Sequence, residues 1–193
     1  MRRTSVLLCT AFVVGSGLLG RELRAQAAPP AGDPRAAMLA EAKQAMSAYA
    51  WLVGEWEGTA TIYMGNNGKM SLVQHESVTS AAFGTALIIQ GRGTMDRNGT
   101  TQQLWDAAAL FAYNAPSKKF SFTSAGGSGM AQMFSVDPQG DGFTWSYNES
   151  ASAKTRFVIT KSADGKWTEV GETSKDGGAT WTKTIDLVLS KKK

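Results

Sequence analysis

The sequence predicts an all-β fold, an antiparallel up-and-down barrel of about ten strands with one N-terminal helix. Short β-type runs fill the chain from about Gly54 to its C-terminal end. Turn sequences separate these runs, among them those at 65–68, 96–99 and 137–140. Turns this close leave no room for crossover helices, so consecutive strands should pair antiparallel. Closure into a barrel then removes the exposed edges.

The first 27 residues have the layout of a secretory signal peptide. Arg2 and Arg3 form a positive start, 6–19 is mostly apolar, and 25–27 reads Ala-Gln-Ala, a site for cleavage. The apolar stretch is too short to span a bilayer comfortably. We therefore expect a signal peptide over 1–27 and an exported protein, periplasmic or extracellular. We expect no stable membrane insertion after cleavage.

The composition after residue 27 excludes several kinds of site. The single cysteine, Cys9, lies within the signal, so the mature chain has no disulfide and no thiol nucleophile. Removing residues 1–27 leaves 16 basic and 15 acidic residues, a net charge of +1. Because so small a charge gives no footprint for a phosphate backbone, we expect no nucleic-acid partner.

A flexible leader over 28–34 and a helix over 35–50 are predicted next. Asp33 can cap the helix, and Pro34 suits its first position. The segment is rich in good helix formers. Its apolar positions recur every three or four residues: Met38, Leu39, Ala42, Ala45, Met46 and Tyr49. We expect this face to pack on a barrel domain over 51–190 and to close one of its ends.

Alternation along the first β-type runs assigns side chains to the barrel interior. Within 55–64 and again within 83–95, every second residue is apolar or small, whereas 71–80 alternates less clearly. The interior positions are Trp56, Gly58, Ala60, Ile62, Leu87, Ile89, Gly91 and Gly93. Because half of these are glycine or alanine, we expect them to leave free volume inside.

The later runs add aromatic residues to the same interior. The run 104–113 is apolar on both sides, so we expect the N-terminal helix to cover part of its outer face. The runs that follow contribute the remaining candidate lining residues: Phe122, Phe143, Trp145 and Trp181.

The sequence Gly54-Glu55-Trp56, after a helix and at the start of a meander, resembles the signature of the calycin barrels. These include lipocalins, fatty-acid-binding proteins and nitrobindin-like proteins. The resemblance implies that Trp56 packs across one barrel end. The longer pattern 52–58, with Gly-Thr-Ala-Leu at 84–87 and a late Asp-Gly-Gly-x-Thr-Trp, is similar to a family of secreted bacterial proteins of unknown function. That similarity implies a fold and no reaction.

Residues 174–181, Ser-Lys-Asp-Gly-Gly-Ala-Thr-Trp, resemble the Asp-box of sialidase-type propellers. In those proteins the motif shapes a hairpin, its aspartate bonding turn amides. A propeller needs repeated blades, and one copy cannot build it. We interpret the motif as a hairpin without catalytic meaning.

His75 is the one histidine, so a histidine-centred metal site would have to be built around it. The nitrobindin-like resemblance implies heme bound through a histidine late in the barrel, but the corresponding region, about 154–161, has none. Heme is therefore retained as an alternative, through His75 or a non-histidine ligand. Otherwise we expect no cofactor and no metal.

Charged residues give few candidates for chemistry. We interpret Glu55, Glu57 and Glu169 as part of the polar outer face. Arg92 and Arg156 are candidate ligand contacts, because an arginine inside a barrel can hold a ligand carboxylate bidentately. For each arginine the alternative is a solvated or salt-bridged surface position.

These observations favour a non-enzymatic barrel that binds a small, largely apolar ligand. The alternative is a structural or interaction module with a filled interior. A hydrolase or isomerase and a heme-handling, nitrobindin-like protein rank below these two. A pocket of a few hundred Å3 would favour binding, whereas a packed interior would favour the module. The sequence assigns neither the ligand nor an oligomeric state.

Overall fold

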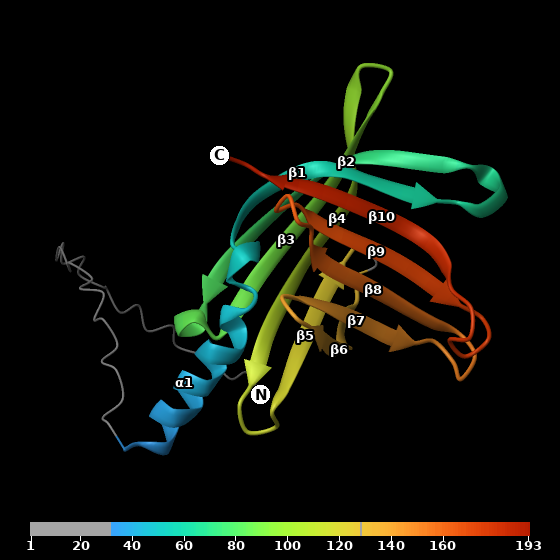
Figure 1. The fold of residues 1–193 in the computed structure, drawn as a ribbon. Helices are drawn as coiled ribbons and strands as arrows, with labels where there is room; N and C mark the ends of the chain where they lie inside the picture. The colour runs from blue at the N-terminus through green and yellow to red at the C-terminus, as the bar shows by residue number, and fades with distance from the viewer. Residues whose placement is uncertain (1–31, 128) are drawn as a thin grey trace, which may run out of the picture.

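The computed structural model describes residues 32–127 and 129–193. Ten antiparallel strands close into one barrel, in which each strand pairs with its sequence neighbours and β1 pairs with β10 (Figure 1). This architecture confirms the predicted fold class. The predicted signal peptide and residues 28–31 of the leader lie outside the described residues.

The strands follow the predicted meander. The turn expected at 137–140 is shorter than predicted, because β6 continues to Gln139, which pairs with Gly142 of β7. Their bounds are β1 (Gly54–Tyr63), β2 (Lys69–Ala81), β3 (Ala86–Arg97), β4 (Thr100–Asn114), β5 (Lys119–Gly126), β6 (Ala131–Gln139), β7 (Gly142–Asn148), β8 (Lys154–Lys161), β9 (Trp167–Ser174) and β10 (Thr182–Lys191).

The N-terminal helix predicted over 35–50 is confirmed but ends at Ser47. Helix α1 (Pro34–Ser47) begins where the Asp33 carboxylate accepts a hydrogen bond from the Arg35 amide at 2.9 Å. A short 3-10 helix, η1 (Ala50–Leu52), follows and turns the chain into β1. None of the helices in the described residues has the length and apolar character needed to cross a bilayer.

The segment between α1 and β1 closes one end of the barrel. The Trp51 indole N–H donates to the backbone carbonyl oxygen of Asp141, between β6 and β7, at 2.8 Å. Tyr49 is 1% exposed, and its ring meets three phenylalanines edge to face: Phe111, Phe120 and Phe143. This aromatic contact fills the closed end from inside.

Trp56 lies at the same end, as the calycin resemblance implied. The side chain is 2% exposed, and its indole N–H donates to the Leu52 carbonyl oxygen at 2.7 Å. Its ring packs edge to face on Trp51 and Trp167. The tryptophan therefore joins η1 to the barrel wall.

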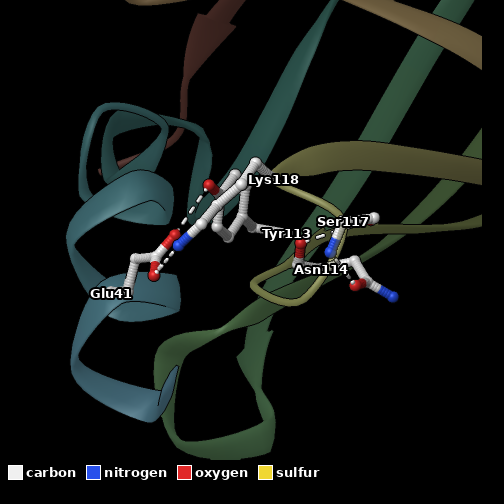
Figure 2. Close-up of polar contacts among 5 residues, drawn as sticks. All are labelled: Glu41, Tyr113, Asn114, Ser117 and Lys118. Atoms are coloured by element: carbon white, nitrogen blue, oxygen red, sulfur yellow. Dashed lines mark hydrogen bonds and ion pairs between the residues drawn. The ribbon is translucent and has the colours of Figure 1, made fainter. Parts of the chain in front are cut away.

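Polar contacts hold α1 against the turn between β4 and β5 (Figure 2). Glu41 forms an ion pair with Lys118 and accepts a hydrogen bond from the Tyr113 hydroxyl at 2.9 Å. The bonds from Lys118 and Tyr113 lower the pKa of Glu41. Asn114 shapes the turn, because its side-chain oxygen accepts from the Ser117 amide at 3.0 Å.

The helix covers less of β4 than predicted. Its polar contacts reach Tyr113, near the end of the strand, whereas Leu104 and Leu110 on the outer surface are 41% and 47% exposed. The apolar outer face of β4 is thus largely open. The expected helical cover is limited to the end of β4, because α1 is fixed at the barrel end.

The Asp-box-like sequence forms the hairpin between β9 and β10, as predicted. The Asp176 carboxylate accepts from the Thr180 amide at 2.9 Å, and the Trp181 indole donates to the Gly178 carbonyl oxygen at 3.0 Å. The pKa of Asp176 is lowered, mainly by the hydrogen bonds that its carboxylate accepts from Thr180. The motif's polar groups are used in shaping the turn.

Candidate functional site

The barrel interior is filled at the end closed by Tyr49 and hollow toward the other end. Phe111 and Phe143 are fully buried near Tyr49. Beyond them a cavity of about 530 Å3 extends toward the opposite turns. Its lining includes small side chains of β4 and β5: Ala107, Ala109, Ser124 and Gly126. These residues leave the space that larger side chains would fill.

The prediction that the glycines of β1 and β3 leave free volume inside the barrel was wrong for Gly58 and Gly91. A Cβ at Gly58 would lie 2.0 Å from the Val188 carbonyl oxygen, so glycine there permits close approach of β10. A Cβ at Gly91 would lie 2.5 Å from a carboxylate oxygen of Glu76. Gly91 therefore makes room for an inward-facing acid.

Five aromatic side chains from β5 to β8 form one side of the cavity, which we call the aromatic wall: Phe122, Phe134, Trp145, Tyr147 and Phe157. Trp145 stacks on Phe157 with ring centroids 3.9 Å apart and on Phe122 at 5.2 Å. Phe134 meets Trp145 edge to face at 4.8 Å. These contacts hold the rings in fixed orientations and give the cavity a rigid apolar side.

Two carboxylates line the same cavity. Glu76 on β2 is 9% exposed, and its Oε1 accepts a hydrogen bond from the Gln74 amide at 2.8 Å. Burial raises the pKa of Glu76 to about 7, although the hydrogen bond from Gln74 acts in the opposite direction. Glu76 therefore changes charge near neutral pH.

Glu169 on β9 is the second acid. Glu169 lies deep in the barrel and is surrounded by protein atoms. Its side chain is only half-buried, because part of its surface borders the cavity. Burial and then the charge of Glu76 raise the pKa of Glu169 to about 8. The Trp145 indole opposes part of this rise, but the geometry falls short of a hydrogen bond and leaves its Nε1 unpaired. The charge of Glu76 thus acts on Glu169, and we call these two glutamates the acid pair.

The charges that border the cavity are all acidic. Besides Glu76 and Glu169, the titratable side chains there are Tyr147 and Glu149, the latter exposed. Within the part of the chain that the structure describes, no lysine, arginine or histidine lines the cavity. The space is thus apolar on one side and acidic on another.

The predicted lining residues fall into two groups. Ile89, Phe122 and Trp145 border the cavity. The others that face inward belong to the packed core or lie against it: Trp56, Ile62, Leu87 and Phe143. Alternation thus placed these side chains inside, although the residues of the second group support the site without bordering it.

The two predicted arginine contacts and Trp181 lie outside the cavity, which corrects their interior assignment. Arg92 is exposed. Successive residues of a strand point to opposite faces of the sheet, so Arg92 points outward because its neighbour Gly91 faces the interior. An Nη2 of Arg156 lies 2.7 Å from Glu172, and its guanidinium lies 4.0 Å from the centre of the Trp181 ring. Neither arginine can hold a ligand carboxylate in the cavity.

His75 also faces away from the interior. Its Nδ1 lies 3.2 Å from a carboxylate oxygen of Glu57, and its side chain is 40% exposed. His75 therefore cannot serve as the ligand of a heme bound in the cavity. Among the described residues, no group of three or more His, Cys, Asp or Glu side chains is placed to hold a metal ion.

The acid pair is the part of the site that sequence reasoning missed. Glu169 was assigned to the outer face, and that assignment was wrong. The signal was present in the alternation: Glu76 lies two residues from Val78, and Glu169 lies two residues from Trp167, both buried. A glutamate in register with buried positions faces inward whatever its charge.

Comparisons with known proteins add evidence on the fold. No protein-family model and no curated protein matches the chain. Among solved structures, the crystal structure of Rv2717c from M. tuberculosis matches with a TM-score of 0.53 and 12% sequence identity, over 79% of this chain and 98% of that chain. At this identity the likeness supports the barrel architecture alone. The resemblance to calycins and to a secreted bacterial family stays a prediction.

Proposed function

We propose that this barrel binds a small, largely apolar molecule in its interior and catalyses no reaction. The observation that carries the proposal is the cavity of about 530 Å3 beside the aromatic wall. Ligand sites in proteins commonly measure about 300–1,000 Å3 and are lined mainly by apolar and aromatic side chains. A structural module with a filled barrel has no need of such a space, so the cavity favours binding over that alternative.

A neutral fluorescent probe, N-phenyl-1-naphthylamine, is expected to bind the folded protein saturably with a micromolar Kd. Replacing Ala107, which lines the cavity, by phenylalanine should weaken this binding at least about tenfold, because the new ring occupies the probe's space. Probe fluorescence during titration measures both Kd values.

The matched control is Ala125→Phe. Ala125 is exposed on β5, next to Gly126, which pairs with Ala107. This substitution adds the same ring outside the barrel and should leave the Kd within about twofold of wild type. If the probe does not saturate on folded wild-type protein, the interior is closed to ligands and the structural module replaces our proposal.

We also propose that the protein acts after export, since residues 1–27 have the layout of a signal peptide. Expression of the full chain in a bacterial host should yield a mature protein that begins at Ala28. N-terminal sequencing of the exported fraction measures the cleavage position. A mature chain that still begins at Met1 would contradict export by this route.

A further inference from the structure

The acid pair lacks the partners that buried carboxylates normally have. Glu76 Oε1 accepts the one hydrogen bond from Gln74, and Oε2 accepts none from the described residues. Glu169 accepts none from them either, because the Trp145 indole that approaches it leaves its Nε1 without a hydrogen-bond partner. A buried carboxylate is costly unless it is paired and hydrogen-bonded. The geometry therefore leaves acceptor positions at the cavity surface open to a donor.

The strands beside the two acids supply no compensating charge. Glu76 lies between Trp56 of β1 and Gly91 of β3 in the sheet register. Glu169 lies between Ile159 of β8 and Leu187 of β10. All four neighbours are uncharged, and the other titratable groups that border the cavity are Tyr147 and Glu149.

The aromatic wall gives the same space an apolar side, against which the uncharged body of a ligand can pack. The wall lies on β5 to β8, and the acids lie on β2 and β9, so both kinds of group border one space. An anionic ligand would meet like charge there.

We propose that the ligand carries a protonated amine on an apolar body, with the amine held by Glu76 and Glu169 and the body against the aromatic wall. This inference rests on the proposed function and names the ligand class of that site. It replaces the carboxylate-bearing ligand that an inward-facing Arg92 would have implied. An ammonium group can donate up to three hydrogen bonds, which matches the open carboxylate oxygens.

The test compares three molecules with one ring system and different charge: 1-naphthylmethylamine, 1-naphthalenemethanol and 1-naphthoic acid. Isothermal titration calorimetry at pH 8 measures each Kd on wild-type protein. We expect the amine to bind at least about tenfold tighter than the alcohol, and the acid to bind more weakly than the alcohol. At pH 5, where the pair is protonated, the preference for the amine should fall.

Glu76→Gln and Glu169→Gln identify the groups responsible. Each variant keeps the side-chain shape and should reduce the preference for amine over alcohol to about twofold. The matched control, Glu172→Gln, makes the same change on β9 at a residue that pairs with Arg156 away from the cavity. It should retain the wild-type preference.

The outcomes separate the two proposals. If the alcohol binds and the amine binds no tighter, or if the acid binds best, the amine inference is overturned while ligand binding stands. If a glutamine variant keeps the full preference, that glutamate does not hold the amine. If none of the three molecules binds the folded protein, both proposals fail.

Discussion

Replacement of Trp56 by alanine is expected to lower the free energy of unfolding by about 3–5 kcal/mol, the usual range for a large aromatic side chain removed from a core. The side chain is 2% exposed, and its indole N–H donates to the Leu52 carbonyl oxygen at 2.7 Å. Its ring also packs on Trp51 and Trp167 at centroid distances of 5.8 and 5.9 Å. The substitution leaves a hole and an unpaired backbone acceptor at the closed end.

Chemical denaturation followed by circular dichroism measures this loss. Trp105→Ala is the matched control, because Trp105 is 52% exposed on β4 and borders the cavity, so its removal widens an existing space and leaves the packed core intact. The control should lose much less stability than Trp56→Ala. Equal midpoints for Trp56→Ala and wild type would mean that this tryptophan does not hold the closed end together.

The fold was predictable because its determinants are local. Turn sequences such as the Asp96–Gly99 segment fix where strands end, and short connections force antiparallel neighbours. Asn98 and Gly99 both adopt positive φ in the turn between β3 and β4, as the Asn-Gly pair suggested. Barrel closure followed from the need to pair the last strand, and β10 does pair with β1.

The site was predictable only where polarity agreed with burial. Ile89 and Trp145 are apolar and line the cavity, so alternation alone placed them. The alternation that places Gly91 and Gly93 inside already turns Arg92 outward, but its side chain was considered for its charge and not for its place in the strand. Charge then led to the wrong inference for Arg92, which lies outside, and for Glu169, which lies inside.

The cavity itself depends on contacts between distant strands. Ala107 and Gly126 are ordinary small residues in the sequence, and they open a space because they face each other across β4 and β5 near the aromatic wall. The effect of the Glu76 charge on Glu169 likewise requires closure of the barrel through β1 and β10. No local pattern encodes that proximity.

The stability of the unliganded protein is expected to fall as the pH rises from about 5 to 8. The folded pKa values of Glu76 and Glu169 are raised to about 7 and about 8 from the ordinary glutamate value of 4.5. Between the unfolded and the folded pKa values the native state holds protons that the unfolded state releases, so the stability decreases with pH. At about 1.4 kcal/mol per pKa unit, the shift of Glu76 alone corresponds to a loss on the order of 3 kcal/mol.

The double variant Glu76→Gln/Glu169→Gln isolates this effect, because amides in both positions cannot ionise. Its unfolding free energy, measured by urea denaturation at half-unit pH steps, should stay nearly level between pH 5 and 8 and exceed that of wild type at pH 8. Glu172→Gln should keep the wild-type slope, since Glu172 belongs to the outer ion pair with Arg156. A wild-type profile that is level or rises over this interval would mean that the two carboxylates are ionised without cost. The cavity would then be too well hydrated to bury an amine against them.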